Sequence, residues 1–188
     1  MIQQVADKVR FFYSFVKSPK TVGSITPSSS FLTKRIFRDV NWENAQTVVE
    51  LGAGTGVFTE WISQRLPAHA AAFIFERDDH MRSRLSERFQ LPNLQIADDG
   101  LALQEVLCKQ GLDSADYIIS SLPFANFSQE LRTQFLDTIQ QTLRPGGLFI
   151  AYQYSRQMES QLRNVFTNVE TSLVPINLPP AFVYTCKK

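Results

Sequence analysis

The sequence predicts an α/β fold of three layers, in which a mostly parallel sheet is covered by helices on both faces. From Thr47 onward, short apolar runs alternate with amphipathic runs, and this alternation implies parallel strand pairing. Within residues 47–62, "TVVELGAGTGVFTEWI", an apolar run passes through three glycines into an amphipathic run, as a buried strand does when a tight loop leads into a helix. A chain of 188 residues with 44% hydrophobic side chains is large enough to bury one such core.

Five apolar runs predict the strands, and four amphipathic runs between them predict the helices. The strands are expected at residues 47–51, 71–75, 94–97, 117–120 and 148–152, and the helices at 57–66, 79–89, 101–110 and 129–143. Asp78 or Asp79 is a suitable N-cap for the second helix, and Arg-Pro-Gly-Gly at 144–147 should end the fourth. Residues 168–176 and 181–186 are β-prone and separated only by "NLPP". They predict a C-terminal antiparallel hairpin at the edge of the sheet.

Residues 1–40 are expected to form an N-terminal amphipathic helix and cap segment, and residues 41–188 the α/β domain, together one globular unit.

The charge is distributed unevenly along the chain. Residues 1–38 hold seven basic side chains and one acidic side chain, a net +6 within a chain of net +1. A basic end of this kind suggests an anionic partner, either a membrane surface or a nucleic acid.

With two cysteines, no signal-sequence pattern and no apolar run of about 20 residues, we expect a cytoplasmic protein without a membrane span or metal site.

The glycine loop distinguishes between families of nucleotide-binding proteins. Gly52, Gly54 and Gly56 give G-x-G-x-G, whereas dinucleotide enzymes need a glycine at the position of Val57. No Lys-Ser or Lys-Thr pair follows, which excludes a P-loop. Preceded by Glu50, the loop resembles the first motif, E/D-x-G-x-G-x-G, of class I S-adenosylmethionine-dependent methyltransferases, whose sheet is Rossmann-like. The resemblance implies that the glycines let the backbone approach the amino-acid part of S-adenosylmethionine and that the acid orients it.

Acidic residues at the ends of the next two expected strands fit the same resemblance. Glu76, in "AAFIFERD", is expected to accept from both ribose hydroxyls, and Asp99, in "LQIADDG", from the adenine amino group. The expected cofactor-binding residues are Glu50, Gly52, Ala53, Gly54, Gly56, Glu76, Arg77, Asp99, Gly100 and Ser120. A Rossmann-like domain that binds another nucleotide is the alternative.

The loop after the fourth expected strand, "IISSLPFANF", should face the transferred methyl group. Adenine N6-methyltransferases carry Asn or Asp there, followed by Leu-Pro or a similar pair and by an aromatic ring that stacks on a flipped base. Here Leu122, Pro123 and Phe124 retain the second part, but Ser121 replaces the amide or acid. Because a serine hydroxyl is a weaker partner for an aromatic amine, this replacement counts against a base-modifying enzyme.

Residues 1–20 have the pattern of a basic amphipathic helix. Apolar side chains recur every three or four positions, and four basic side chains accompany them. Such a helix can lie in a bilayer interface, drawn by anionic headgroups; alternatively, the apolar stripe packs on the α/β domain as a lid. We expect contact with an anionic membrane, which would place the protein, as a monomer, on the inner face of the membrane.

A longer resemblance narrows the substrate class. The segment "SPKTVGSITPSSS", the glycine motif and "SSLPFANF" together resemble bacterial phospholipid N-methyltransferases of the phosphatidylethanolamine-methylating type. This resemblance implies methyl transfer to a lipid amine, with an ornithine lipid as an alternative acceptor. The candidate catalytic residues are Tyr13, Ser121 and Tyr152, and the candidate substrate residues are Thr26, Leu122, Pro123, Phe124 and Tyr154. An RNA adenine N-methyltransferase and a non-catalytic cofactor-binding module are the alternative functions.

Overall fold

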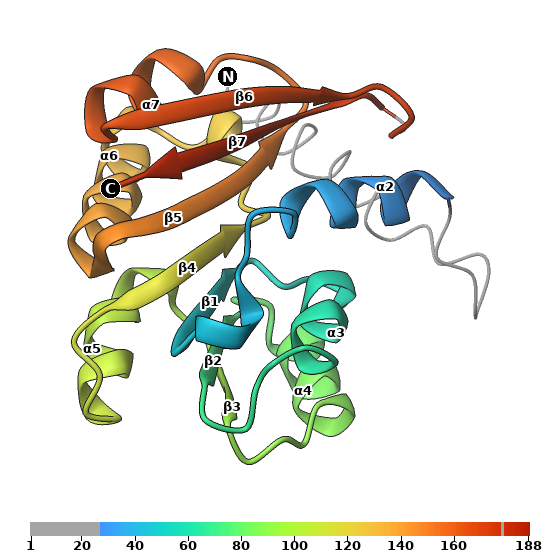
Figure 1. The fold of residues 1–188 in the computed structure, drawn as a ribbon, viewed down its shortest axis with the longest axis vertical. Helices are drawn as coiled ribbons and strands as arrows, with labels where there is room; N and C mark the ends of the chain where they lie inside the picture. The colour runs from blue at the N-terminus through green and yellow to red at the C-terminus, as the bar shows by residue number, and fades with distance from the viewer. Residues whose placement is uncertain (1–26, 178) are drawn as a thin grey trace.

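A seven-stranded sheet forms the middle layer of the computed structural model, which describes residues 27–177 and 179–188. The strand order is β3-β2-β1-β4-β5-β7-β6 (Figure 1). The strands are β1 (Thr47–Leu51), β2 (Ala71–Phe75), β3 (Leu94–Ala97), β4 (Ala115–Ser120), β5 (Leu143–Gln153), β6 (Asn168–Val174) and β7 (Ala181–Lys187). β1 to β5 pair in parallel, whereas β7 is antiparallel to both β5 and β6. The predicted mostly parallel sheet with a C-terminal hairpin is therefore confirmed.

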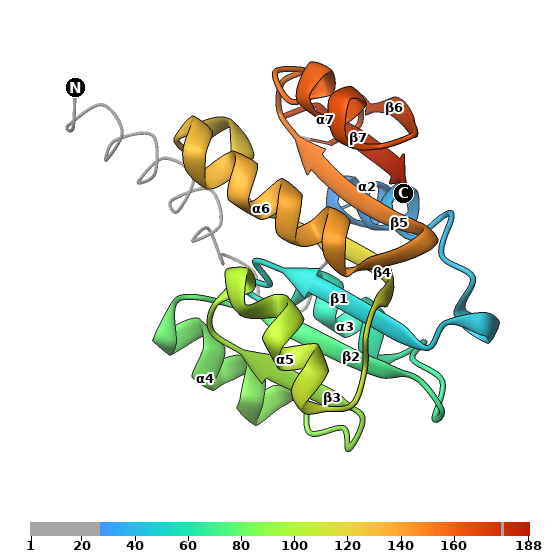
Figure 2. The same cartoon turned by 90° about the vertical axis from the view of Figure 1, so that its left-hand side faces the viewer.

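Helices cover both faces of this sheet, as Figures 1 and 2 show from two sides. One face carries α2 (Pro27–Ile36), α3 (Val57–Ser63) and α4 (Asp79–Arg88), and the other carries α5 (Leu103–Lys109), α6 (Gln129–Thr142) and α7 (Glu159–Val165). Short 3₁₀ turns lie at Trp42–Asn44, Gly100–Ala102 and Phe124–Asn126. Asp78 is the N-cap of α4, where its carboxylate accepts from the backbone N of Met81 at 2.9 Å.

Two hydrophobic clusters, one on each side of the sheet, form the core. Val49, Leu51 and Phe149 pack against α5, α6 and α7, whereas Val48 and Ile150 face α2, α3 and α4. The strand β1 is buried along its whole length, as expected for a central parallel strand covered on both faces. This packing fixes the strand ends, from which the loops of the candidate site extend.

The structure changes several predicted boundaries. β5 begins at Leu143 rather than at residue 148, because the Arg-Pro-Gly-Gly segment that ends α6 continues into the sheet. The register between β4 and β5 shifts at Ala115/Tyr117, and Gly146 takes a positive φ of 76°. Both features are those of a bulge, which lets a strand bend without leaving the sheet. In addition, α3 ends at Ser63 rather than at residue 66, and the helices α2 and α7 were not predicted.

The N-cap glycine of α3 provides a test of this packing. Gly56 has a φ of +84°, and a Cβ there would lie 2.7 Å from Cδ2 of Leu85 on α4 and 2.9 Å from Cε2 of Phe89, the C-cap residue of α4. Gly56→Ala should lower the free energy of unfolding by about 2–4 kcal/mol, since left-handed strain and overpacking add. Gly111 has a similar φ of +72° but nothing within 4 Å, so Gly111→Ala should cost only about 1–2 kcal/mol. Urea titrations that gave equal losses for both variants would contradict the packing contribution.

Candidate active site

The glycine loop after β1 has a backbone that only glycine adopts readily. Gly52, Gly54 and Gly56 have φ values of 78°, 57° and 84°, in the left-handed region. The backbone N–H groups of Gly52 and Ala53 donate to the carbonyl of Phe75 at 2.8 and 3.1 Å, which ties the loop to the end of β2. The loop therefore offers bare backbone to a ligand at the carboxyl edge of the sheet.

Glu50 precedes this loop and is completely buried. One carboxylate oxygen accepts from the Thr59 hydroxyl at 2.7 Å, whereas Oε1 has no hydrogen-bond partner within residues 27–177 and 179–188. Burial raises the pKa of Glu50 to about 8; the Thr59 hydroxyl lowers it, and the nearby charge of Glu76 raises it. Because buried polar atoms in folded proteins are almost always paired, this orphaned oxygen fits a ligand that brings its own donor, such as an ammonium group.

Glu76 closes the glycine loop from the end of β2. Its two carboxylate oxygens accept from the backbone N of Gly54 at 2.7 Å and from that of Asp78 at 2.9 Å. The residue is only 8% exposed. Since a carboxylate has about four lone-pair positions, Glu76 keeps acceptor capacity for hydroxyl groups beside the loop.

The end of β3 contributes a third acid. Asp99 is exposed, and its Oδ1 accepts from the backbone N of Leu101 at 2.9 Å, which starts the following 3₁₀ turn. Gly100 lies so close to the core that a Cβ would be 3.1 Å from the Phe135 ring and 3.2 Å from Leu51. Arg77 is exposed on the neighbouring loop after β2. The acids at the carboxyl ends of β1, β2 and β3 (Glu50, Glu76 and Asp99) thus lie along one edge of the sheet.

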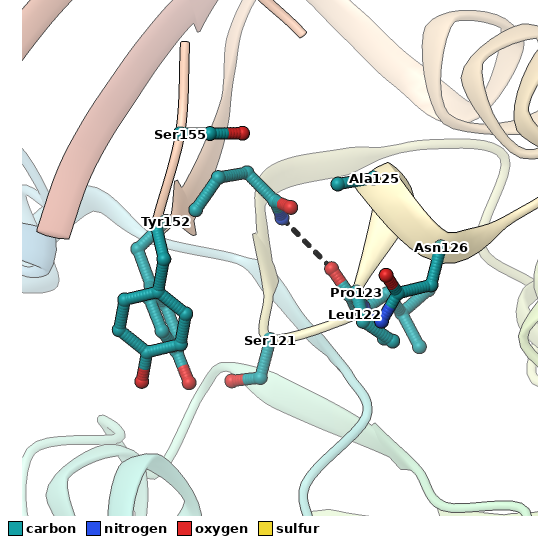
Figure 3. Close-up of a pocket in the computed structure, with 9 residues that line it drawn as sticks. Ser121, Leu122, Pro123, Ala125, Asn126, Tyr152 and Ser155 are labelled. Atoms are coloured by element: carbon teal, nitrogen blue, oxygen red, sulfur yellow. Dashed lines mark hydrogen bonds between the residues drawn. The ribbon is translucent and has the colours of Figure 1, made fainter. Parts of the chain in front are cut away.

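A cleft of about 140 Å³ opens beside β4 and β5 (Figure 3). Its lining residues are Ser121, Leu122, Pro123, Ala125, Asn126, Tyr152, Gln153, Tyr154 and Ser155. Gln153 is 6% exposed, and its Nε2 donates to the Leu122 carbonyl at 2.9 Å. Ser120, which is fully buried, accepts from the Leu122 backbone N at 3.2 Å. These two bonds fix the loop that forms one wall of the cleft.

Two tyrosines from the end of β5 form the opposite wall. The ring centroids of Tyr152 and Tyr154 are 5.8 Å apart, in an edge-on arrangement. Burial raises the pKa of both phenols; the neighbouring Tyr154 raises the pKa of Tyr152 further, whereas Ser121 lowers it. Figure 3 shows the Ser121 hydroxyl beside the Tyr152 ring. Both phenols are therefore neutral at physiological pH, and they present hydroxyl groups to the cleft.

Phe124 does not lie in the cleft, which corrects its expected contact with the substrate. It is 1% exposed and packs against Phe127, Phe135 and Phe149 at centroid distances of 5.6 to 6.2 Å. The 3₁₀ turn at Phe124–Asn126 directs the ring into the core beneath α6. The neighbouring Asn126 lines the cleft instead. Leu122 and Pro123, which were expected among the substrate residues, line the cleft.

Sequence reasoning missed three polar residues at the site. Thr59 donates to the Glu50 carboxylate, Gln153 holds the loop after β4, and Asn126 lines the cleft. Thr59 had a usable signal, because it lies on the buried side of the first helix turn after the glycine loop. The expected residues Tyr13 and Thr26, and the amphipathic segment 1–20, lie outside the described residues.

Known proteins share both the sequence pattern and the fold. A family model described as a methyltransferase domain matches residues 48–147. An ornithine lipid N-methyltransferase of Singulisphaera acidiphila is 34% identical over 184 residues, with 94% of each chain covered. The ribosomal RNA small subunit methyltransferase A of Thermotoga petrophila is 27% identical over 111 residues, 58% of this chain and 40% of that protein. The N-methyltransferase NodS of Bradyrhizobium japonicum, solved with S-adenosyl-L-homocysteine, has a TM-score of 0.72 at 13% identity, with 94% and 97% of the two chains covered.

The strand order of the sheet, the glycine loop and the acidic residues at the ends of β1, β2 and β3 define a class I S-adenosylmethionine-dependent methyltransferase. The chain belongs to the methyltransferase-domain family, whose model covers more than half of its length. Its cofactor is S-adenosylmethionine, as the resemblance implied.

The buried carboxylate predicts how stability depends on pH when no cofactor is bound. The pKa of Glu50 rises from 4.5 to about 8 on folding, so the folded protein holds a proton that the unfolded chain releases in this range. Stability should therefore fall as the pH rises from about 4.5 to about 8. Glu50→Gln removes the ionisation, so its free energy of unfolding should fall less between pH 5 and pH 8.

The matched control is Glu105→Gln on α5, where the carboxylate is exposed and paired with Lys109 at 2.7 Å. Denaturant titrations at both pH values should give this variant the wild-type decline. An identical decline in Glu50→Gln would mean that Glu50 is ionised throughout.

Proposed function

We propose that this protein N-methylates the amine headgroup of a membrane lipid, and that the lipid is an ornithine lipid. The similarity to the ornithine lipid N-methyltransferase supports this most strongly, because it extends over 94% of both chains and so includes the acceptor loop as well as the cofactor loop. Our sequence-based expectation named phosphatidylethanolamine as the acceptor. The comparison favours the ornithine headgroup over it, while the lipid amine as a class stays the same.

We assign the cofactor to the carboxyl edge of β1, β2 and β3. S-adenosylmethionine supplies a methyl group on a positively charged sulfur. Glu50 and the Gly52–Gly54 backbone would hold its amino-acid part, since the free Oε1 of Glu50 requires a donor. Glu76 would accept from the ribose hydroxyls, and Asp99 from the adenine amino group. The remaining expected residues, Ala53, Gly56, Arg77, Gly100 and Ser120, lie in the loops or at the strand ends around these positions and stay part of the proposed cofactor site.

Ser121, Tyr152 and Tyr154 are proposed to orient the acceptor amine. Methyl transfer needs a nitrogen lone pair aligned with the methyl group, so the protein contributes mainly positioning and exclusion of water. Neutral phenol and serine oxygens can accept N–H hydrogen bonds and thereby aim the lone pair. Because the pKa of each phenol is raised, a tyrosinate base is disfavoured, and the proton of the ammonium form leaves to water. Leu122 and Pro123 would provide the apolar wall.

The edge-on tyrosine pair also suits the product. Each added methyl group makes the nitrogen a bulkier and, finally, a permanent cation. Aromatic faces stabilise such cations by about 0.5–2 kcal/mol. Tyr152 and Tyr154 are proposed for this role, because the Phe124 ring is buried in the core.

Membrane contact through residues 1–20 remains part of the proposal, with the protein as a monomer on the inner membrane face. The support is the basic amphipathic pattern of that segment. Within the described part of the chain, no helix is long and apolar enough to cross a bilayer. Contact would therefore be made from the surface, where a lipid headgroup can enter the cleft.

Removal of the Glu76 carboxylate tests the cofactor assignment. Glu76→Ala should weaken S-adenosylmethionine binding by about 1–3 kcal/mol, because the ribose hydroxyls lose a charged acceptor. Glu43→Ala removes an exposed acid in the 3₁₀ turn before β1 and should leave affinity unchanged. Calorimetric titration gives both values, and wild-type affinity in Glu76→Ala would remove Glu76 from the site.

A labelled-methyl transfer assay tests the acceptor. The full chain is incubated with methyl-labelled S-adenosylmethionine and, separately, with ornithine lipid vesicles, phosphatidylethanolamine vesicles and ribosomal RNA. Label should enter the ornithine lipid, and Glu76→Ala should reduce this signal at limiting cofactor. Label in phosphatidylethanolamine alone would overturn the headgroup, and label in RNA alone would overturn the lipid class and favour the similarity to the ribosomal RNA enzyme.

A further inference from the structure

The hairpin formed by β6 and β7 has an unusual composition for a surface element. Residues 171–186 contain no charged side chain and no histidine. Gly, Pro, Asn, Asp and Ser dominate turns; the turn between these strands reads Pro-Ile-Asn-Leu-Pro-Pro, which adds two large aliphatic side chains to three prolines and one asparagine. Leu173 is 53% exposed and Ile176 is 59% exposed. These two are the most exposed of the large apolar side chains that the structure describes.

The hairpin tip lies at the same edge of the sheet as the acceptor cleft. Phe182 of β7 pairs with Gln153, which lines the cleft, on one side and with Leu173 of β6 on the other. Two strand spacings separate Leu173 from Gln153, about 10 Å. The Tyr184 hydroxyl of β7 donates to the carbonyl of Ser155, another lining residue, at 3.1 Å. Figure 1 shows the β6–β7 turn projecting past the end of β5, on the same side as α2.

The turn is held in shape by its own bonds. Asn177 is buried; its backbone N donates to the Val174 carbonyl at 3.3 Å, and its Nδ2 donates to the Pro179 carbonyl at 2.7 Å. Prolines on both sides of Asn177 restrict the backbone further. A preorganised apolar tip loses little conformational entropy when it enters another medium.

The charges at the base of the hairpin are balanced. Arg35 on α2 and Arg38 in the turn after it both contact Glu170 on β6, at 2.9 and 3.0 Å, and both also contact Asp39. Two cations and two anions thus form one neutral network. This network therefore adds no net charge at the base of the hairpin, and the large exposed side chains of the tip itself are apolar.

We propose that the hairpin tip, defined by Leu173 and Ile176, inserts into the outer part of a lipid bilayer and holds the acceptor cleft against the headgroup layer. The choice of a bilayer as the partner rests on the proposed function, because a lipid headgroup must reach a cleft that opens about 10 Å from this tip. Insertion removes apolar surface from water and is favourable by about 25 cal/mol for each Å² buried. It acts separately from the attraction expected for the basic segment 1–20.

A double substitution tests the tip without adding charge. Leu173→Ser together with Ile176→Ser should lower binding of the full chain to phosphatidylcholine vesicles by about tenfold or more, measured by co-sedimentation. The loss should be equal at low and high salt, because no charge is changed. The control is Leu91→Ser, which removes a 36% exposed apolar side chain before β3, at the opposite edge of the sheet. This variant should bind vesicles as the wild type does.

Two further measurements separate the tip from folding and from catalysis. Denaturation midpoints and S-adenosylmethionine affinity should be unchanged in the double variant, since both side chains are exposed. Methyl transfer to ornithine lipid in vesicles should fall, whereas transfer to a short-chain monomeric ornithine lipid should not.

Vesicle binding does not depend on which acceptor is methylated. A loss of binding in the double variant therefore supports the tip even if neither lipid is methylated and the proposed function fails. Wild-type binding in the double variant, or no binding by the wild type, overturns the proposal. A change in cofactor affinity or in oligomeric state, with vesicle binding intact, also overturns it, because the tip would then contact the chain itself or a second copy.

Discussion

The parallel pairing of β1 with β4 is the constraint on which the site depends. Its register places Leu51 beside Ser120, and the backbone N of Ser121 donates to the Leu51 carbonyl at 2.9 Å. The glycine loop after β1 and the loop after β4 therefore leave the sheet side by side. The contact is close enough that a Cβ at Gly52 would lie 3.0 Å from the Leu122 side chain. On the proposed assignment, the sheet itself would thus bring a methyl donor on one loop close to an acceptor on the other.

The same edge of the sheet contains an energetically unfavourable group, the buried Glu50 carboxyl, at the position proposed for the cofactor. Glu50 is buried with one unpaired oxygen, and the charge of Glu76 lies close enough to raise its pKa. A stable core would favour an apolar residue there, because an unsatisfied buried carboxylate is unfavourable. A ligand with a positively charged donor relieves both the missing bond and the repulsion. On the proposed assignment of Glu50 to the cofactor, cofactor binding would therefore stabilise this edge of the sheet.

In the part of the chain that the structure describes, the proposed cofactor region and the cleft differ in chemical character. Backbone groups and carboxylates at β1, β2 and β3 suit a polar nucleoside with an amino-acid tail, whereas neutral hydroxyls, aromatic rings and an apolar loop line the cleft at β4 and β5. The uncharged hairpin continues this second region outward. The gradient from polar to apolar along one edge is consistent with a water-borne cofactor and a membrane-borne acceptor.

The sequence by itself determined the succession of strands and helices along the chain up to β5, the glycine loop and the acids at the strand ends, because these depend on short-range patterns: apolar periodicity and backbone conformations that only glycine tolerates. The tertiary structure alone decided which side chains face the cleft. Phe124 and Asn126 are two residues apart, yet one ring fills the core and the other side chain lines the cleft. Gln153 reaches Leu122 across 31 residues of sequence. Such contacts depend on loop geometry and on pairing between strands that are distant in sequence, and local sequence patterns predict neither.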